Sequence, residues 1–310
     1  MIDTYTAGDP MQEGVLWTNL TRSEIAAGLQ EQGFVVSVTS VDRLLEEFQL
    51  GQRKPRKSKT MHHDPNRDAQ FRHIAKLKRE SLKAGLPVLS MDTKKREMLG
   101  DYVRPGRVFS SAPLRGWDHD FPTHSSGVVI PHGLYDLGLN EGYLHLGDTH
   151  DTSELAADAL IDWWRSYGRV RYPRAAAMLL LCDGGGSNGA NRLVFKEQLQ
   201  RVVDATDLLI KVAHYPPGCS KFNPIEHRLF PHITRKLQGL FLKSLAMFRD
   251  LAKRATTRTG LRVFARSLRG MYEIGKHAAV QSAEQLRIRY DRVLPKWNYI
   301  VIPKLIWQVI

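Results

Sequence analysis

The sequence predicts a mixed α/β domain that follows a small helical segment, on three observations. From about residue 85 to residue 150, short strand-like segments succeed one another with turn residues between them. From residue 151 onward, helical and strand-like segments alternate, as in a mixed sheet covered by helices. The first fifty residues instead show the apolar spacing of helices. With 310 residues, of which 42% are apolar, the chain is long enough to bury a core.

Two short helices are expected near the N-terminus. The first begins in LTRSEIAAGL, where Thr21 is the expected N-cap and Glu24 completes a capping box. A second start, SVTSVDRLLEEF, follows a glycine that suits a helix end. Two such helices joined by a tight turn indicate a helix-turn-helix, although an ordinary helical hairpin gives the same pattern. In the first interpretation the second helix offers three side chains to a DNA major groove: Thr39, Ser40 and Arg43.

A basic arm, RKPRKSK, follows these helices. It offers Arg53, Lys54, Arg56 and Lys57 to phosphates or to a minor groove, and a solvated linker is the alternative. Over the whole chain 45 Lys and Arg outnumber 32 Asp and Glu, which gives a formal charge of +13. A surplus of this size favours a polyanionic partner, and double-stranded DNA first.

A connecting helix, NRDAQFRHIAKLKRESLKAG, is expected next, and the sheet begins after it. We expect strands at LPVLSMD, GRVFSS, GVVIPHGLYD and EGYLHLGD, followed by a helix at DTSELAADALIDWWRSYG with Asp151 as its cap. AMLLLCD, NRLVFKEQLQRVV and DLLIKVAHYP continue as strand, helix and strand, and another helix opens at NPIEHRLF. The expected domains are 1–60 (helix-turn-helix and arm), 61–84 (connecting helix), 85–245 (α/β domain) and 246–310 (mainly helical, with a strand-like GLRVFA).

Three acidic residues stand at the ends of expected elements: Asp92, Asp183 and Glu226. Carboxylates gathered at strand ends can hold two divalent cations about 3.5–4 Å apart, and hard oxygen ligands suit Mg²⁺. Each acid also has a simpler explanation. Glu226 fits a capping box with Asn223, Asp183 fits an Asx-type turn, and Asp92 fits a helix cap. Glu97, Asp148 and Asp151 compete for the same role.

The stretch DGGGSNG places glycines directly after Asp183. They permit either a sharp turn or the close approach of a phosphate, but the spacing is not G-x-G-x-x-G and no Walker lysine follows. A nucleotide-binding enzyme is therefore the weakest alternative. Cationic and polar residues beside the acids are expected to contact DNA: Lys94, Lys95, Asn188, Lys221 and Arg228.

Composition argues against other classes of protein. The two cysteines, Cys182 and Cys219, lack CxxC spacing, which argues against a zinc site or a disulfide framework and favours a reducing cytoplasm. No apolar run approaches the length of a membrane-spanning helix, so we expect no membrane association. A cytoplasmic, nucleoid-associated protein is the expectation.

Several stretches together resemble one known family. They are MDTKKREMLG, HDF, IPHGLYDLGLNEGYLHLGDTHDT, WWRSYGRVRYPRAAAMLLLCDGGGSNGANR, HYPPGCSKFNPIEHRLFPHI, TTRTGLRV and WNYIVIP, in order from about residue 53 to residue 303. The chain thereby resembles the transposases of the ISAzo-type insertion sequences, whose catalytic part is the Rhodopirellula-type transposase DDE domain.

The resemblance implies an RNase H-like fold with a DDE triad. By motif match Asp92, Asp183 and Glu226 look like the first, second and third acids, which would hold two Mg²⁺ ions, with Mn²⁺ as a substitute. The implied activity is DNA strand cleavage and strand transfer on the terminal repeats of the element and on target DNA, by a homo-oligomer assembled on DNA.

The chain departs from the family pattern in three places. Phe222 stands where a tryptophan is expected, Cys219 replaces a threonine, and TRKLQGLFL replaces a tryptophan-containing stretch. The chain also begins almost at its helix-turn-helix, where relatives have more helical sequence, so a truncated copy is expected. The alternative function is a truncated, catalytically silent DNA-binding remnant that represses transposition.

Overall fold

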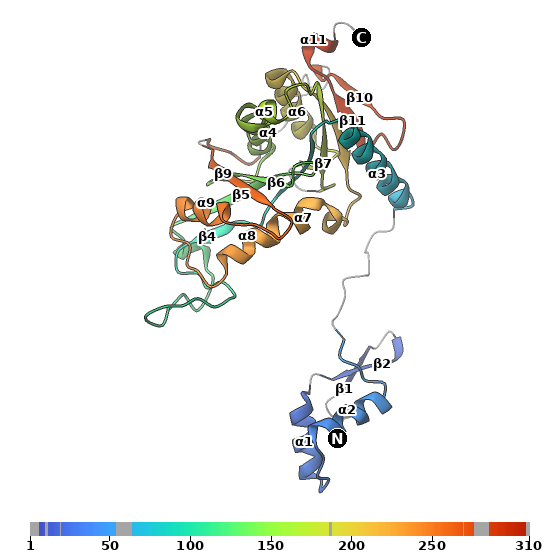
Figure 1. Cartoon of the computed structure of the whole chain (residues 1–310), viewed down its shortest axis with the longest axis vertical. Coiled ribbons are helices and arrows are strands. Elements are labelled where there is room, and N and C mark those ends of the chain that lie inside the picture. The colour runs from blue at the N-terminus through green and yellow to red at the C-terminus, as the bar shows by residue number, and fades with distance from the viewer. Residues whose placement is uncertain are drawn as a thin grey trace. The chain divides into compact units, whose positions relative to one another are not determined.

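The computed structural model describes residues 6–9, 12–18, 20–53, 64–185, 188–268, 270–275 and 285–307. The chain divides into two compact units, Met1–Lys59 and Thr60–Ile310, each of which is built on its own contacts (Figure 1).

The smaller unit contains the two predicted helices, α1 (Arg22–Glu31) and α2 (Val38–Glu47). Thr21 and Glu24 form the predicted capping box at the start of α1. A hairpin of β1 (Thr6–Asp9) and β2 (Gln12–Thr18) precedes the helices, and no pattern in the sequence predicted it. The DNA-reading role of α2 stays a prediction.

The larger unit is organised around one sheet. Its strands are β3 (Val88–Thr93), β4 (Glu97–Leu99), β5 (Gly127–Asp136), β6 (Glu141–Gly147), β7 (Ala177–Cys182), β8 (Leu209–His214), β9 (Arg262–Ser267), β10 (Ile288–Tyr290) and β11 (Asn298–Val301). Within the described residues their order is β10-β11-β8-β7-β3-β5-β6-β9, and β4 pairs with β5. β3, β5 and β6 form an antiparallel meander, whereas β7 and β8 lie parallel to β3 on its other side. This arrangement of β6, β5, β3, β7 and β8 is that of an RNase H-like sheet, which confirms the fold class predicted for this unit, whereas the helix-turn-helix of the smaller unit stays a prediction.

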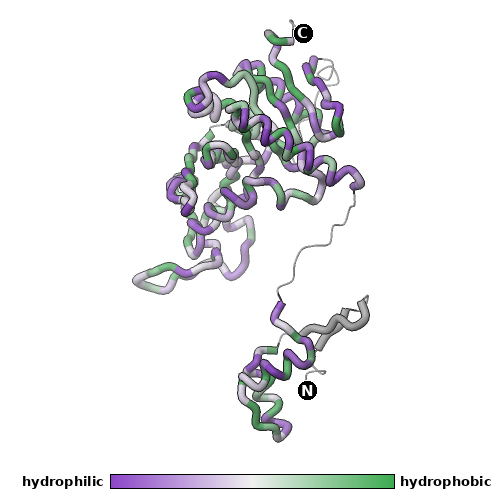
Figure 2. Tube along the Cα trace, turned by 45° about the vertical axis from the view of Figure 1, so that its right-hand side comes forward, coloured by the Kyte–Doolittle hydropathy of each residue, from purple (hydrophilic) through white to green (hydrophobic). Residues whose placement is uncertain are grey.

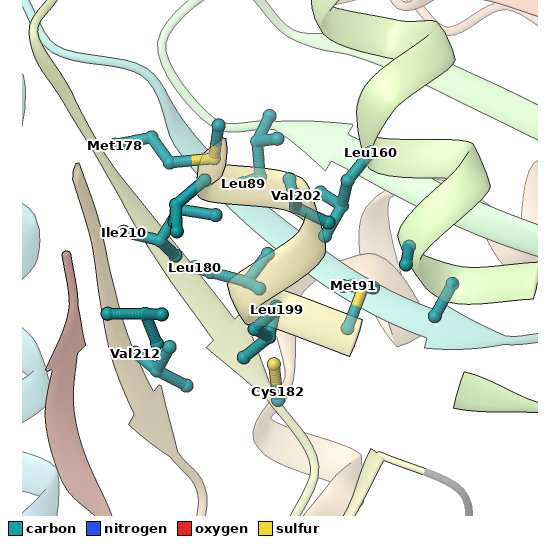
Figure 3. Close-up of a cluster of buried hydrophobic side chains, with 14 of the residues drawn as sticks. Leu89, Met91, Leu160, Met178, Leu180, Cys182, Leu199, Val202, Ile210 and Val212 are labelled. Carbon is teal, nitrogen blue, oxygen red and sulfur yellow. The ribbon is translucent and has the colours of Figure 1, made fainter. Parts of the chain in front are cut away.

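Helices cover both faces of this sheet. They are α3 (Arg67–Lys83), α4 (Ser153–Trp163), α5 (Arg169–Arg171), α6 (Leu193–Thr206), α7 (Pro224–Arg228), α8 (Phe230–Leu237), α9 (Leu245–Lys253) and α11 (Lys304–Trp307). On one face, Leu160 of α4 and Val202 of α6 pack on Leu89, Met91 and Leu180 (Figure 3). On the other face, α7, α8 and α9 pack on β5 and β6, and α3 packs on β3 and β7. Burial on both faces explains the continuous apolar run of β7, and the helices mix hydrophilic and hydrophobic residues along their length (Figure 2).

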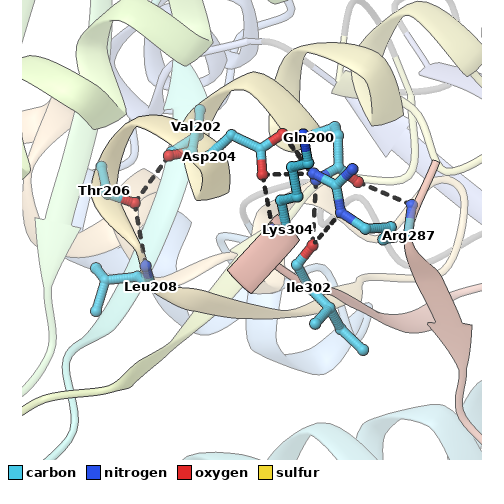
Figure 4. A network of polar contacts seen from close by, with 8 residues as sticks. All are labelled: Gln200, Val202, Asp204, Thr206, Leu208, Arg287, Ile302 and Lys304. Carbon is cyan, nitrogen blue, oxygen red and sulfur yellow. Dashed lines mark hydrogen bonds and ion pairs between the residues drawn. The ribbon is translucent and has the colours of Figure 1, made fainter. Parts of the chain in front are cut away.

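A polar network fixes the C-terminal strands to α6. The Arg287 guanidinium binds the Asp204 carboxylate at 2.5 Å and the Ile302 carbonyl at 3.2 Å, and its backbone N–H donates to Gln200 Oε1 at 2.9 Å (Figure 4). The Lys304 N–H also donates to Asp204. β10 and β11 thus extend the sheet beyond β8, a region for which a mainly helical structure was expected. They are strands because β8 needs a hydrogen-bonding partner on its outer edge, and β11 provides it.

Two further expectations differ from the structure. GRVFSS forms no strand. It lies in the loop between β4 and β5, where Val108 and Phe109 are exposed and have no neighbouring strand to pair with. α4 is capped by Thr152, whose side chain accepts from the Leu155 N–H, rather than by Asp151. In the part of the chain that the structure describes, no helix is long and apolar enough to cross a membrane.

Candidate active site

Two aspartates stand at one edge of the sheet because their strands are parallel neighbours. β3 and β7 pair with Met91 opposite Cys182. Asp92 follows Met91 in β3, and Asp183 follows Cys182 directly after β7, so the two half-buried carboxylates are adjacent. The expectation that both stand at strand ends is confirmed, and the register explains why they meet.

Glu226 reaches the same edge through α7, which is anchored to β3. The buried side chain of Asn223 donates to the Met91 carbonyl at 3.1 Å, and the Ser90 hydroxyl donates to Asn223 Oδ1. Ser90 Oγ also accepts from the Ile225 N–H at 3.0 Å. These bonds fix the first turn of α7 beside the end of β3, where Glu226 lies close enough to Asp92 to act on its pKa.

The capping-box explanation for Glu226 does not hold. Asn223 is the N-cap of α7, as its type suggests, but its side chain makes no cap hydrogen bond. Its amide is instead committed to β3, and the Glu226 side chain contacts Asp92. Asn223 therefore positions Glu226 in space, which the sequence pattern alone did not indicate.

Burial raises the pKa of both aspartates. Burial raises the pKa of Asp92 most, the charges of Glu226 and Asp183 add to that effect, and the Thr93 N–H opposes it by donating at 2.8 Å, so that the pKa is about 7. Burial also raises the pKa of Asp183, against the opposing effect of the Gly184 N–H at 2.6 Å. A group of half-buried carboxylates with raised pKa values is characteristic of a site that holds cations or protons.

The donor set fits divalent cations with hard oxygen ligands. Within the described ranges, no three His, Cys, Asp or Glu side chains are arranged as they stand to hold a single ion. Asp92, however, interacts with both Asp183 and Glu226. In a two-ion site Asp92 would therefore contribute to both ions, and Asp183 and Glu226 would contribute to one each.

The competing acids have other partners. Glu97 pairs with the buried Lys94 ammonium and, at 3.1 Å, with Arg104, so its charge is already neutralised. Asp151 accepts from the Thr93 hydroxyl at 2.9 Å and lies on the opposite side of β3 from Asp92. Asp148 is exposed.

The residues expected to contact DNA lie in several places. Lys95, Lys221 and Arg228 are exposed near the acids, whereas Lys94 is buried against Glu97 and Asn188 is buried with its Oδ1 lacking a hydrogen-bond partner among the described residues. Thr39, Ser40, Arg43 and Arg53 are exposed in the smaller unit. Lys54, Arg56 and Lys57 lie outside the described residues.

A cavity of about 1020 Å³ opens beside Glu226. The β3–β4 turn lines one side of it with Lys95 and Arg96, and α8 lines the other with Arg235. Sequence reasoning missed Arg235 because its helix shows no motif, and only the fold brings it opposite the turn. The cavity therefore joins the acidic edge to a cationic wall.

One glycine after Asp183 has a packing role. A Cβ at Gly184 would lie 2.6 Å from the Tyr215 carbonyl oxygen, so the loop after β8 requires a residue without a side chain there. At Gly185 a Cβ would meet nothing within 4 Å, so this position alone does not require glycine for packing. The close approach of the loop after β8 explains the first glycine without a ligand.

Comparisons with known proteins place the chain in a family. The family model described as Rhodopirellula transposase DDE domain matches residues 1–303. A Mos1 transposase paired-end complex with the left transposon end is 15% identical, with a TM-score of 0.44, over 78% of this chain and 72% of that one. The mariner Mos1 paired-end complex with Mg is also 15% identical over the same shares, with a TM-score of 0.45. A search of curated proteins finds no match. The family match spans nearly the whole sequence, and we conclude that the chain belongs to the Rhodopirellula transposase DDE domain family.

Proposed function

We propose that this transposase cleaves and joins DNA strands with two divalent cations held by Asp92, Asp183 and Glu226. The observation that carries the proposal is that Asp92 lies beside Asp183 in the register of the sheet and close enough to Glu226 for its charge to act on the Asp92 pKa, although the three acids come from different elements. Mg²⁺ is the proposed ion, and Mn²⁺ is expected to substitute because it accepts the same oxygen ligands.

When bound, the two ions would stabilise the attacking and the leaving oxygen of a phosphodiester during in-line displacement. The side chains of the chain itself have simpler tasks. Asp92 would contribute to both ions. The Thr93 N–H orients Asp92, and the Gly184 N–H orients Asp183. Asn223 and Ser90 hold the first turn of α7, and with it Glu226, beside the end of β3.

The reaction that this arrangement serves is phosphodiester exchange. In the first step a water oxygen attacks phosphorus at the element end and the 3′ oxygen leaves as a 3′-OH. In the second step that 3′-OH attacks a phosphodiester of the target DNA, and the target's own 3′ oxygen leaves. Neither step requires a covalent enzyme intermediate or a change of redox state.

The cationic wall of the cavity beside Glu226 is the proposed path of the DNA backbone into the site. Lys95, Arg96 and Arg235 line this cavity, and in the described part of the chain none of them forms an ion pair with an acid. Cations without acidic partners are available to phosphates, and they offset the negative charge of the acids that the DNA must approach.

The other predicted contacts complete the proposal for DNA binding. Thr39, Ser40 and Arg43 of α2 are exposed and are proposed to read the terminal repeats, with Arg53 and the basic arm on the adjacent backbone. Lys221 and Arg228 flank α7 and are proposed to contact phosphates near the acids. As the family resemblance implies, we also propose that this chain acts as a homo-oligomer on DNA.

The proposal is tested by a strand-cleavage assay on DNA that carries the ends of the element, with Mg²⁺ or Mn²⁺. We expect nicking by the unmodified chain and none by Asp183→Asn, which should bind DNA as well as or better than the unmodified chain because a negative charge is removed. DNA binding without nicking in either protein would favour the silent repressor. Loss of binding in Asp183→Asn would assign that residue a structural role.

A further inference from the structure

A row of polar side chains crosses the sheet on the side opposite to Asp92. Thr93 of β3 pairs with His132 of β5, and His132 pairs with His145 of β6. Register partners project to the same face, and Asp92 projects to the other because it precedes Thr93 in the strand. These residues belong to the stretches MDTKK, IPHG and LHLGD. Apart from Asp92, no residue of these stretches belongs to the triad.

Thr93 is the point at which this row meets the acids. Its hydroxyl donates to Asp151 Oδ1 at 2.9 Å and contacts His132 Nδ1 at 2.8 Å. Its backbone N–H donates to Asp92 Oδ1 at 2.8 Å. At the far end of the row, His145 Nε2 lies 3.0 Å from Asp162 Oδ2.

The proton positions follow from these contacts. A hydroxyl has one hydrogen, and Thr93 gives it to Asp151, so it accepts from His132, whose proton must be on Nδ1. Complete burial lowers the pKa of His132 to about 3, so the ring is neutral and its Nε2 is an acceptor. That Nε2 is buried and has no hydrogen-bond partner among the described residues.

Thr93 is therefore held from both sides. Asp151 accepts from its hydroxyl and His132 donates to it, so the side chain has one rotamer in which both bonds form. The rotamer is fixed at the last residue of β3, where the chain leaves the sheet toward the β3–β4 turn. The Thr93 N–H donates to the Asp92 carboxylate, so the orientation of that carboxylate depends on how Thr93 is held.

We propose that His132 and Asp151 are positioning residues that act through Thr93 to aim the Asp92 carboxylate. The inference rests on the proposed function, because it concerns how Asp92 is presented to the cations. Partners behind a metal ligand commonly matter in this way, and their loss weakens metal affinity or activity by about 10–100-fold.

The test is Mn²⁺ binding to the full chain without DNA, followed by electron paramagnetic resonance. Thr93→Val removes the hydroxyl with little change of shape and should weaken Mn²⁺ binding by about 10-fold or more. Thr93→Ser restores the hydroxyl and should bind nearly as the unmodified chain does. Asp151→Asn changes an exposed residue, which spares folding, and should shift the affinity in the same direction by a smaller factor.

Thr206→Val is the matched control. Its hydroxyl donates to the Val202 carbonyl at 2.8 Å, at the end of α6, so the change also removes a hydroxyl hydrogen bond but none near Asp92 (Figure 4). We expect its Mn²⁺ affinity to be unchanged. Equal affinity in Thr93→Val and the unmodified chain would overturn this inference alone, whereas absence of Mn²⁺ binding by the unmodified chain would overturn the proposed function with it.

A second readout is independent of any metal. ¹⁵N chemical shifts of the imidazole rings should show neutral His132 with its proton on Nδ1 in the unmodified chain, and a mixture of tautomers in Thr93→Val. An unchanged tautomer in Thr93→Val would mean that the threonine hydroxyl does not hold this ring. The Nε2-protonated form of His132 in the unmodified chain would contradict the hydrogen-bond direction on which the inference depends.

Discussion

Removal of one hydroxyl group, Ser90→Ala, should both destabilise the larger unit and disable the site. Ser90 Oγ donates to Asn223 Oδ1 and accepts from the Ile225 N–H, and all three residues are 0% exposed. Alanine has nearly the same shape as serine, so the main effect is that Asn223 Oδ1 and the Ile225 N–H each lose a hydrogen-bond partner. Each such group costs about 1–3 kcal/mol, so we expect a loss of about 3 kcal/mol in the free energy of unfolding.

In a unit of this size, that loss corresponds to a decrease in Tm of about 6–12 °C. The measurement is urea unfolding together with strand cleavage at a temperature where the variant is folded. Cleavage should decrease more than DNA binding because α7 carries Glu226. Ser166→Ala is the control, since Asp162 and Arg266 remain an ion pair at 3.5 Å after its hydroxyl is lost. A stability change below about 0.5 kcal/mol, the usual range of a surface substitution, would refute the anchoring of α7 by Ser90.

Three other changes test separate parts of the structure. The slope of log K for duplex binding against log salt concentration should decrease in magnitude by about 0.9 in Arg235→Gln. Arg289→Gln, on the β10 edge, should leave this slope unchanged. Equal slopes in Arg235→Gln and the unmodified chain would exclude the cavity from the DNA path. Glu141→Gln should lower the free energy of unfolding, measured in urea, by about 3 kcal/mol, because its carboxylate is 0% exposed and pairs with Arg171 and Arg262. A loss near zero would mean that these two ion pairs do not stabilise the fold. Burial lowers the pKa of His132 from 6.5 to about 3, so the unfolded chain gains this proton first and stability decreases as the pH falls below 6.5, by about 1.4 kcal/mol per pH unit. His132→Gln should lack that part of the slope between pH 6 and pH 4.5, and an identical slope would contradict a neutral buried ring.

The sequence predicted the sheet well where periodicity and length agreed. The apolar run of β7 and the alternation of helix and strand around it identified the central strands, and the acids at strand ends followed from them. GRVFSS had the composition of a strand but lies in a loop, because a strand also needs a partner and β4 occupies the available edge of β5. Local composition does not contain that information.

The acidic residues of the site were predictable from the sequence, but the residues that hold them in place were not. Asp92, Asp183 and Glu226 could be named from motif and position, yet Ser90 and Asn223 gave no signal, since a buried serine and a helix-cap asparagine look ordinary in a sequence. Asp151 was expected to cap α4, but the neighbouring Thr152 does so, which leaves Asp151 to hold Thr93. Contacts between strands distant in the chain depend on register, and register is a property of the whole sheet.

The most direct test of the account is the number of Mn²⁺ ions that the chain binds. With Asp92 shared between two ions, the unmodified chain should bind two, and Asp92→Asn should lose both. Asp183→Asn and Glu226→Gln should each retain one, because each of these acids lies beside a single ion. Two ions still bound by Asp92→Asn would contradict the shared position of this aspartate and the two-ion site built on it.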